Sequence, residues 1–399
     1  MTQRNYRLVG WAAVIGGFVW MMDWGVRGPS IFGDAARPLG WCFLGLFGSL
    51  WPWRSKLEAP QPDEGATAVD DENKSETRSE SSEEKIVGQM LTDGRHALLL
   101  RPQITQHLNL DQHAAALSHL HEQTAVIPDG DVIVQHWTAG KTPGSEEHDR
   151  LVTVDAFYLD RHLITNRQFQ RFVRAGGYEE LDLWDPAVVP AILQFVDRAG
   201  KSGPRFWTHG CYPAGEDDFP VVGISWFEAA AYSRWIGMRL PTNAEWTKAG
   251  AWPIPTDGAR PHQRKFPWGE SMNRQLANLW GSGPGRTCSV FDFDEASIGG
   301  VHQLIGNVWE WLATPFNPCD ETGLKLVLST PMKTICGGAF DTYFDSQATC
   351  QFQSGDDPMA RKHNIGFRCA LNFCDVAQSY DLDHAAPEHE HVLQGETVQ

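Results

Sequence analysis

The pattern of apolar and polar residues changes character several times along the chain. Near the N-terminus, two almost uninterrupted apolar stretches run over Leu8–Val26 and Pro38–Trp53. The first is long enough to cross a bilayer, and the second is shorter but bounded by aromatic residues that suit the membrane interface. We therefore predict a transmembrane hairpin over residues 1–56 and a membrane-anchored protein.

The basic residues that flank these stretches indicate an orientation. If both stretches span, the two ends of the hairpin share one side, and the flanking bases favour a cytoplasmic large domain. If only the first stretch spans, the large domain is exported. A cleavable signal peptide or a buried hairpin of a soluble protein would also give an apolar N-terminus.

Two segments have too few large apolar residues to form a core. Residues 57–84 are acidic and rich in Ser, Pro and Glu, and residues 375–399 are acidic and rich in His. Such compositions cannot offset the conformational entropy that folding removes. We predict a disordered linker and a disordered tail.

Residues 85–125 return to helical periodicity, and Leu110–Ala125 predicts an amphipathic helix. This helix carries His113, His119 and His121. A metal-binding pair of histidines on a helix stands one turn apart, on the same face. The spacings here are six and two residues, which do not place these histidines on one face. We therefore expect solvent-facing histidines on a small helical element and no metal.

In residues 126–374 the apolar periodicity alternates between patterns typical of short strands and patterns typical of short helices. Apolar alternation over Val152–Tyr158 predicts a strand, and Thr165 or Asn166 can cap the helix that follows. This mixture of short elements predicts an α+β domain.

Two capping boxes mark further helices. Ser225 with Glu228 and Thr242 with Glu245 have the spacing in which side chain and backbone bond reciprocally. They flank the link Arg239–Pro241, so two consecutive helices are expected there.

Composition narrows the choice of function. The 17 tryptophans and 38 glycines favour a loop-rich fold. The formal net charge of −17 argues against nucleic-acid binding, because phosphate contacts need clusters of Lys and Arg. The eight cysteines show no CxxC spacing, so neither a structural zinc site nor a disulfide scaffold is indicated.

Five further motifs follow the capped helices in order. They are FPWGE (Phe266–Glu270), ANLW (Ala277–Trp280), LIGNVWEW (Leu304–Trp311), CGGAF (Cys336–Phe340) and NIGFRC (Asn364–Cys369). Together with the T-N helix, ISWFEA and RLPTNAEW, the ordered set resembles the formylglycine-generating-enzyme (sulfatase-modifying-factor) family. The resemblance covers Ile127–Leu371 and implies an irregular, loop-rich variant of the C-type lectin-like fold.

The resemblance also assigns structural roles. Cys350 and Cys369 match late structural cysteines of the family, whose partners would stand at Ser233 and at a residue near Ala249, so both disulfides are expected to be missing. The positions that match the family scaffold are Asn166, Trp226, Glu228, Arg239, Glu245, Trp246, Trp268, Asn307, Trp309, Gly338 and Arg368.

The family's chemistry is expected to be altered here. Active members hold Cu(I) with two cysteines shortly after the G-G-S-aromatic turn, and they oxidise a substrate cysteine to formylglycine. In this chain the turn is followed by DTYFDSQ (Asp341–Gln347), which contains no cysteine. A rearranged pair, Cys336 with Cys350, is a weak copper alternative, because the geometry of such a site must be held tightly. Copper is therefore not expected.

A calcium ion is the cofactor that the resemblance favours. Gly306, Val308 and Glu310 match the family's oxygen ligands near G-N-x-W-E, and Asn278 matches a ligand of a second calcium position. Glu310 could instead be a buried carboxylate satisfied by backbone N–H groups or by Arg368.

Three functions are compatible with these features. The first is a catalytically altered family member that binds a peptide, protein or glycan. The second is an oxidoreductase with a rearranged metal site; relatives also serve as substrate-binding domains of iron-dependent sulfoxide synthases, although residues 85–125 are too short to supply the iron histidines. The third is a membrane-tethered assembly factor. We favour the first combined with the third.

Overall fold

The computed structural model describes residues 82–135, 150–252, 263–293, 299–318 and 324–376, which belong to one compact unit. The predicted hairpin, nearly all of the predicted linker and nearly all of the predicted tail lie outside these residues. Within the described ranges, no helix is long and apolar enough to cross a bilayer. The expectation of a membrane anchor is therefore corrected for the described residues alone, because none of their helices could span a bilayer.

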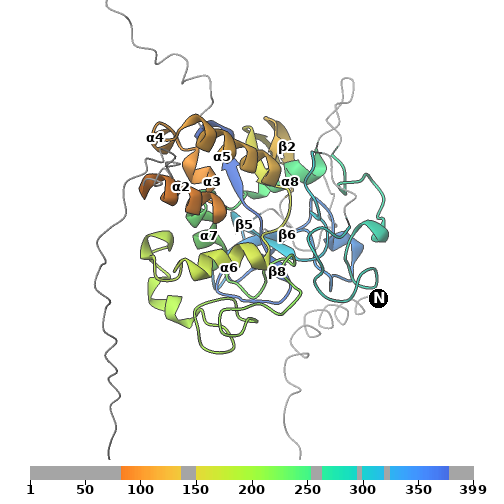
Figure 1. Cartoon of the computed structure of the whole chain (residues 1–399). Coiled ribbons are helices and arrows are strands. Elements are labelled where there is room, and N and C mark those ends of the chain that lie inside the picture. Colours follow the sequence, from red (N-terminus) through yellow and green to blue (C-terminus); the bar gives the residue numbers. More distant parts are fainter. Residues whose placement is uncertain (1–81, 136–149, 253–262, 294–298, 319–323, 377–399) are drawn as a thin grey trace, which may run out of the picture. The chain divides into compact units, whose positions relative to one another are not determined.

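Among the described residues, four helices precede the first strand. They lie close to one another at one side of the unit (Figure 1). α5 begins after Asn109, whose side chain accepts a hydrogen bond from the first helical turn and completes a capping box. The Arg95 guanidinium donates to the carbonyl of Trp235 at 2.9 Å, and Arg101 donates to that of Gly237 at 2.8 Å. The helices are α2 (Ser82–Thr92), which begins slightly before the predicted element, α3 (His96–Leu99), α4 (Pro102–Thr105) and α5 (Leu110–Gln123).

The predicted amphipathic helix is confirmed as α5, but one of its histidines is not where it was expected. His113 is buried, with 6% exposure, because it shares a helical face with Ala116 and Leu120. His119 and His121 are exposed, as expected.

The described strands form three small sheets. One has the order β1-β4-β9, the second pairs β2 with β3, and the third has the order β7-β6-β5-β8, in which β5 and β8 run parallel. The strands are β1 (Thr124–Ile127), β2 (Gly130–Val134), β3 (Arg150–Val154), β4 (Phe157–Asp160), β5 (Trp309–Phe316), β6 (Met332–Cys336), β7 (Gln353–Asp356), β8 (Ile365–Gly366) and β9 (Ala370–Asn372).

The predicted strand Val152–Tyr158 is divided between two sheets. Val152 pairs with Val132 in the β2–β3 hairpin, whereas Tyr158 pairs with Val126 on one side and with Leu371 on the other. The continuous strand was therefore wrong, although both halves are extended.

The predicted helix caps are confirmed. Thr165, Ser225 and Thr242 each accept a hydrogen bond from the backbone three residues on, and each capping box is complete. The helices that they begin are α6 (Asn166–Arg174), α7 (Trp226–Trp235) and α8 (Asn243–Ala251). Short 3-10 turns lie at Leu181–Leu183, Val189–Gln194, Arg274–Leu276, Asp345–Gln347 and Phe373–Asp375.

Aromatic rings fill the space between the helices. Phe169 of α6 stacks on Tyr232 of α7 with centroids 5.3 Å apart, and Phe172 meets the edge of Trp235 at 5.7 Å. A second core cluster surrounds Trp246 of α8 and lies under β5 and β6. These two clusters fix the ends of β5 and β6, from which the site loops start.

Candidate functional site

The site is built on the turn that follows β6. Gly337 and Gly338 have φ angles of 96° and 75°, a region that favours glycine, and a Cβ atom on Gly337 would stand 2.6 Å from the carbonyl oxygen of Leu304. The carbonyl of Gly337 accepts a hydrogen bond from Gly306 at 2.9 Å, and the N–H of Phe340 donates to Asn307 at 3.1 Å. The CGGAF and GNVWEW motifs are therefore joined backbone to backbone.

Asn307 connects a third loop to this turn. It has a φ of 65°, and its buried side chain accepts from the N–H of Cys288 at 3.0 Å and donates to the carbonyl of the same residue at 3.1 Å. Its amide also donates to Gln303 at 2.8 Å. One asparagine thus fixes the path of the loop that follows the ANLW motif.

The loop after Phe340 takes the place where the resemblance implied copper thiols. Thr342 is buried, and its hydroxyl accepts a hydrogen bond from the N–H of Ala339 at 2.8 Å. Its carbonyl accepts from Trp280 at 3.3 Å. Gln347 ends a 3-10 turn. The side chains of this loop offer hydroxyl, amide and carboxylate groups, and no thiol.

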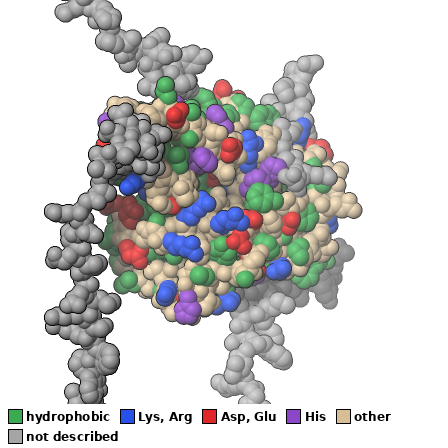
Figure 2. Space-filling view, in the orientation of Figure 1, with side chains coloured by type: hydrophobic (Ala, Val, Ile, Leu, Met, Phe, Trp, Pro, Cys, Tyr) green, Lys and Arg blue, Asp and Glu red, His purple; other side chains and the backbone are tan. Residues whose placement is uncertain are grey.

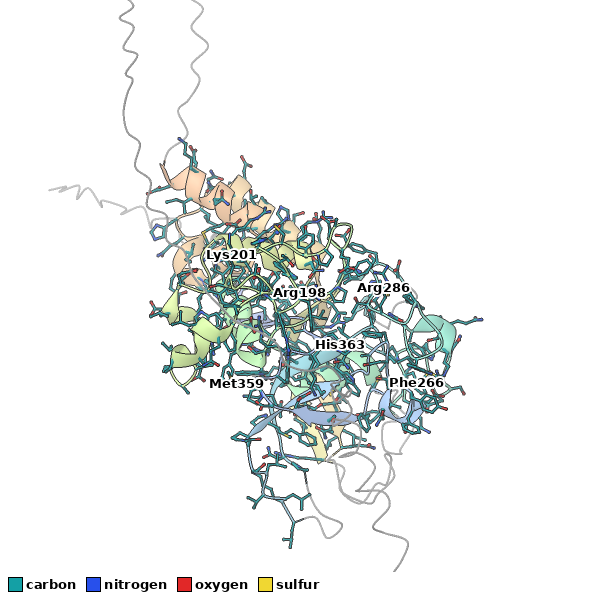
Figure 3. The ribbon with its side chains drawn as sticks, turned by 90° about the horizontal axis from the view of Figure 1, so that it is seen from below. Arg198, Lys201, Phe266, Arg286, Met359 and His363 are labelled. Carbon is teal, nitrogen blue, oxygen red and sulfur yellow. The ribbon has the colours of Figure 1, made fainter. Side chains whose placement is uncertain are left out.

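A carboxylate and an imidazole meet beside this turn. The Asp341 carboxylate accepts from the amide of Asn364 at 3.0 and 3.2 Å and lies 3.8 Å from the Nε2 atom of His363. The His363 ring contacts Phe340 and Phe206, with centroids 5.7 and 6.5 Å apart. Figure 3 shows His363 near the middle of the face seen from below, with Met359 on one side and Phe266 on the other. The pair can donate and accept hydrogen bonds at a surface with apolar walls.

Exposed aromatic rings lie on this loop and on the ANLW segment, which a backbone hydrogen bond joins to it. Trp280, Tyr343 and Phe344 are 56%, 62% and 60% exposed, which is unusual for side chains of this size. Arg274 donates to the carbonyl of Trp280 at 2.6 Å and to that of Tyr343 at 3.1 Å, and it forms an ion pair with Asp345. The backbone that carries the rings is therefore held firmly, while the rings themselves face solvent. We call Trp280, Phe340, Asp341, Tyr343, Phe344 and His363 the loop site.

Cys336 and Cys350 do not form a copper site in this arrangement. Both side chains are buried, with 1% and no exposure, and burial raises the pKa of each thiol above its ordinary value. Cu(I) binds thiolates, and forming them here would place negative charge in a buried surrounding that disfavours it. The residues present do not fit copper.

The late cysteines lie where the resemblance placed them. The Cys369 sulfur is 3.2 Å from the hydroxyl of Ser233, and a Cβ atom on Gly250 would stand 2.8 Å from the sulfur of Cys350. The residue expected near Ala249 is therefore Gly250. Both cysteines are free thiols.

The four residues of the expected calcium site are close together, but their oxygen atoms mostly accept hydrogen bonds from other protein groups. Both oxygens of Glu310 accept from Arg368, at 2.7 and 2.9 Å, and both side chains are fully buried. The carbonyl of Gly306 accepts from Val308 at 2.9 Å. These residues do not fit a calcium ion held through Glu310, whereas a carboxylate paired with Arg368 accounts for the geometry.

Asn278 is the remaining member of that set. Its amide nitrogen donates to the carbonyl of Arg286 at 2.9 Å, whereas its side-chain oxygen is buried without a partner among the described residues. A Cβ atom on Gly283 would fall 1.9 Å from this oxygen, so the loop closes tightly over it. In the described part of the chain, no three His, Cys, Asp or Glu side chains are arranged to hold a metal ion.

The scaffold residues form separate buried networks around the loop site. Glu228 accepts from the hydroxyl of Tyr178 at 2.6 Å and from Arg361 at 3.0 Å, and Arg239 binds both oxygens of Glu245. Trp226 donates to a β5 carbonyl at 2.9 Å. Asn166, Trp246, Gly338 and Arg368 are likewise buried, and Trp268 and Trp309 are half-buried.

The pairing of Asp341 with His363 and the contact of Glu228 with Arg361 were not predicted from the sequence. In the sequence, Asp341 is notable only because it lies near the positions of the missing thiols. The available signal for His363 and Arg361 was their place directly before the NIGFRC motif, in a loop that leads to a family landmark.

Comparison with known proteins identifies a family and several relatives. Residues 112–373 match the model of the sulfatase-modifying factor enzyme 1-like domain. The hercynine oxygenase of Mycolicibacterium smegmatis is 35% identical over 207 residues, which cover 49% of this chain and 46% of that protein. The chain therefore spans less than half the length of that relative.

Two bovine proteins match over a longer share of their own length. The formylglycine-generating enzyme of Bos taurus is 28% identical over 262 residues, covering 56% of this chain and 67% of that protein. The inactive C-alpha-formylglycine-generating enzyme 2 of the same species is 28% identical over 249 residues, which cover 55% of this chain and 79% of that protein. The matched relatives thus include proteins named as oxygenases or enzymes and proteins named as inactive.

Proposed function

Because the chain belongs to the sulfatase-modifying factor enzyme 1-like family, we propose that its domain is a catalytically altered member, of the C-type lectin-like fold, that binds a peptide segment of a protein ligand at the loop site. The observation that carries this proposal is the loop after Phe340. Together with Trp280 and His363 from neighbouring segments, it presents aromatic rings and a carboxylate–imidazole pair where the resemblance implied two copper thiols.

The exposed rings support a protein ligand. Tyr and Trp give a large contact area with little side-chain entropy to lose, and they are enriched where proteins bind. Trp280, Tyr343 and Phe344 stand on backbone that Arg274 already holds, so little further ordering is needed on binding. The apolar rings would receive an apolar side chain of the peptide.

The polar members of the loop site support a peptide backbone as the second element of recognition. Asp341 can accept a backbone N–H, and the exposed His363 can donate to a carbonyl. His363 is 63% exposed in its side chain, and Asn364 holds the carboxylate beside it. One apolar contact and two polar ones would fix both position and direction of the peptide.

Selection of peptides on the full chain tests this proposal. A display library of random peptides is selected on the wild-type protein, and the enriched sequences are then measured against the variant Trp280→Ala/Phe344→Ala. We expect binding to fall at least about tenfold, the loss of one well-placed aromatic contact. The matched control is Leu193→Ala/Val327→Ala, which removes side chains that are 88% and 97% exposed elsewhere.

Two results would contradict the peptide-binding function. The first is that enriched peptides bind the aromatic variant as well as the wild type. The second is that no peptide is enriched while a glycan array gives a signal that depends on Trp280, which would assign the same loop to a sugar ligand.

An oxidoreductase is the second candidate, and the names of the matched relatives favour it. In that case Cys336 and Cys350 would have to rearrange, or a metal would have to be held by groups outside the described residues. Titration of the full chain with Cu(I), followed by incubation with a cysteine-containing sulfatase peptide, separates the two candidates. Formation of a peptide aldehyde would overturn the binding-module proposal, and unchanged peptide would support it.

A further inference from the structure

A groove of about 710 Å³ lies between α6 and the group formed by α5 and the helices before it. It shares no lining residue with the loop site. In Figure 2, Lys and Arg side chains gather over α6, and histidine side chains lie between α6 and α5. A volume of this size is typical of pockets for small organic ligands.

The walls of the groove come from different parts of the chain. One wall is α6, inside the region matched by the family model, and the other is formed by Leu91–Gly94, by His96 and by His119 of α5. Arg95 and Arg101 bind the end of α7 and hold the second wall in place. The groove therefore needs both the family domain and the helices before it.

Arg171 is the charged group that stands out in this groove. It projects from α6 toward the turn at Gly94, where a Cβ atom would lie 3.7 Å from its Nη1 atom. Among the described residues, its guanidinium has no ion-pair or hydrogen-bond partner. The neighbouring Arg167 differs, because it pairs with Asp218 at 3.0 Å. Asp93, Glu122, Asp160 and Asp218 also line the groove, but none of these carboxylates forms an ion pair with Arg171 among the described residues. Arg171 thus offers a positive charge with two parallel N–H donors.

His96 provides a second unsatisfied group. It is 7% exposed, its Nε2 atom is buried without a partner among the described residues, and its ring stacks on that of His119 with centroids 6.2 Å apart. A buried polar atom without a partner costs about 1–3 kcal/mol. A ligand group that bonds to this nitrogen would remove that cost.

The floor of the groove is apolar. Tyr232, Ile236 and Met238 are buried and line it. A ligand with a flat or apolar body would therefore exchange water for these side chains while its polar end reaches the walls.

We propose that this groove is a binding site for a small carboxylate with an apolar or aromatic body. The carboxylate pairs with the Arg171 guanidinium, the body lies on Tyr232 and Met238, and a polar atom of the ligand bonds to His96. The site is separate from the loop site and does not depend on the peptide-binding function.

Two probes of the same size and opposite charge test the proposal on the full chain. Phenylacetate and phenethylamine are titrated while the ring signals of His96 and His119 are followed by NMR. We expect phenylacetate to shift both histidines in a saturable way and phenethylamine to leave them in place. Arg171→Gln should weaken phenylacetate binding at least about tenfold, and Arg171→Lys should weaken it less, since it keeps the charge but loses the two parallel donors.

The matched control is Arg174→Gln, which removes an exposed arginine of the same helix that does not line the groove. It should bind phenylacetate as the wild type does, and circular dichroism establishes that each variant is folded. Equal binding of phenethylamine, or undiminished binding of phenylacetate by folded Arg171→Gln, would overturn the proposal.

Discussion

At the scale of single residues, the ion pair of Glu310 with Arg368 decides what the GNVWEW motif does. Both side chains are fully buried, and Arg368 also donates to backbone carbonyls at Asp160 and His302. Removing one partner of such a pair leaves an uncompensated buried charge, which is far costlier than the net gain from forming it. The motif therefore contributes to the stability of the scaffold.

The substitution Glu310→Gln measures this role. We expect it to lower the free energy of unfolding by about 3–5 kcal/mol, whereas Asp356→Asn, which removes a partner of the exposed Lys362, should cost less than about 1 kcal/mol. Both are measured by chemical denaturation in calcium and in chelator. A wild-type stability that depends on calcium, and loses this dependence in Glu310→Gln, would instead restore calcium as the partner of Glu310.

At the scale of elements, helix starts were predictable because their signals are local. Ser225 and Glu228, or Thr242 and Glu245, lie within one turn, so the sequence alone contains both partners of each capping box. Strands were less predictable. The division of Val152–Tyr158 depends on its pairing with Leu371, which is far away in the sequence.

The loop site was predictable only in part, for the same physical reason. The missing thiols after Phe340 were visible in the sequence, because the G-G-x-aromatic turn marks the place. The contact of Asp341 with His363 was not, since it joins two loops through the fold. The pairing of Glu310 with Arg368 was one of two alternatives that the sequence offered, and the choice between it and calcium depends on tertiary packing.

The capping box at the start of α7 gives a prediction at this scale. Ser225 is fully buried, and its hydroxyl accepts from Glu228 at 3.2 Å. Ser225→Ala should destabilise the protein by about 1 kcal/mol, as measured by chemical denaturation. The control Ser118→Ala on the exposed side of α5 should change stability by less than about 0.5 kcal/mol. Equal effects of the two substitutions would show that the cap adds nothing to stability.

At the scale of the whole molecule, two buried groups in the groove between α5 and α6 titrate in opposite directions. Burial lowers the pKa of His96 from 6.5 to about 4, with a smaller effect of His119. Burial raises the pKa of Asp160 from 3.8 to about 7, against hydrogen bonds from Cys369 and the charge of Arg368. Both shifts act on stability over nearly the same range of pH.

The signs of these two contributions follow from proton binding. Below pH 6.5 the unfolded chain protonates His96 and the folded protein does not, so stability is lost as the pH falls toward about 4. Between pH 3.8 and about 7 the folded protein keeps Asp160 protonated and the unfolded chain does not, so stability is lost as the pH rises. The two slopes, each at most about 1.4 kcal/mol per pH unit, oppose one another in the wild type.

Substitution of either group should therefore leave only the other group's contribution to the pH dependence of stability. Relative to the wild type, we expect the stability of His96→Gln to fall as the pH rises from about 4 to 6.5, and that of Asp160→Asn to rise over the same interval. Chemical denaturation at several pH values measures both, and the difference from wild type removes the contribution of the other carboxylates. If both variants keep the slope of the wild type, the two groups do not titrate differently in the folded and unfolded protein, and their burial has no electrostatic consequence for folding.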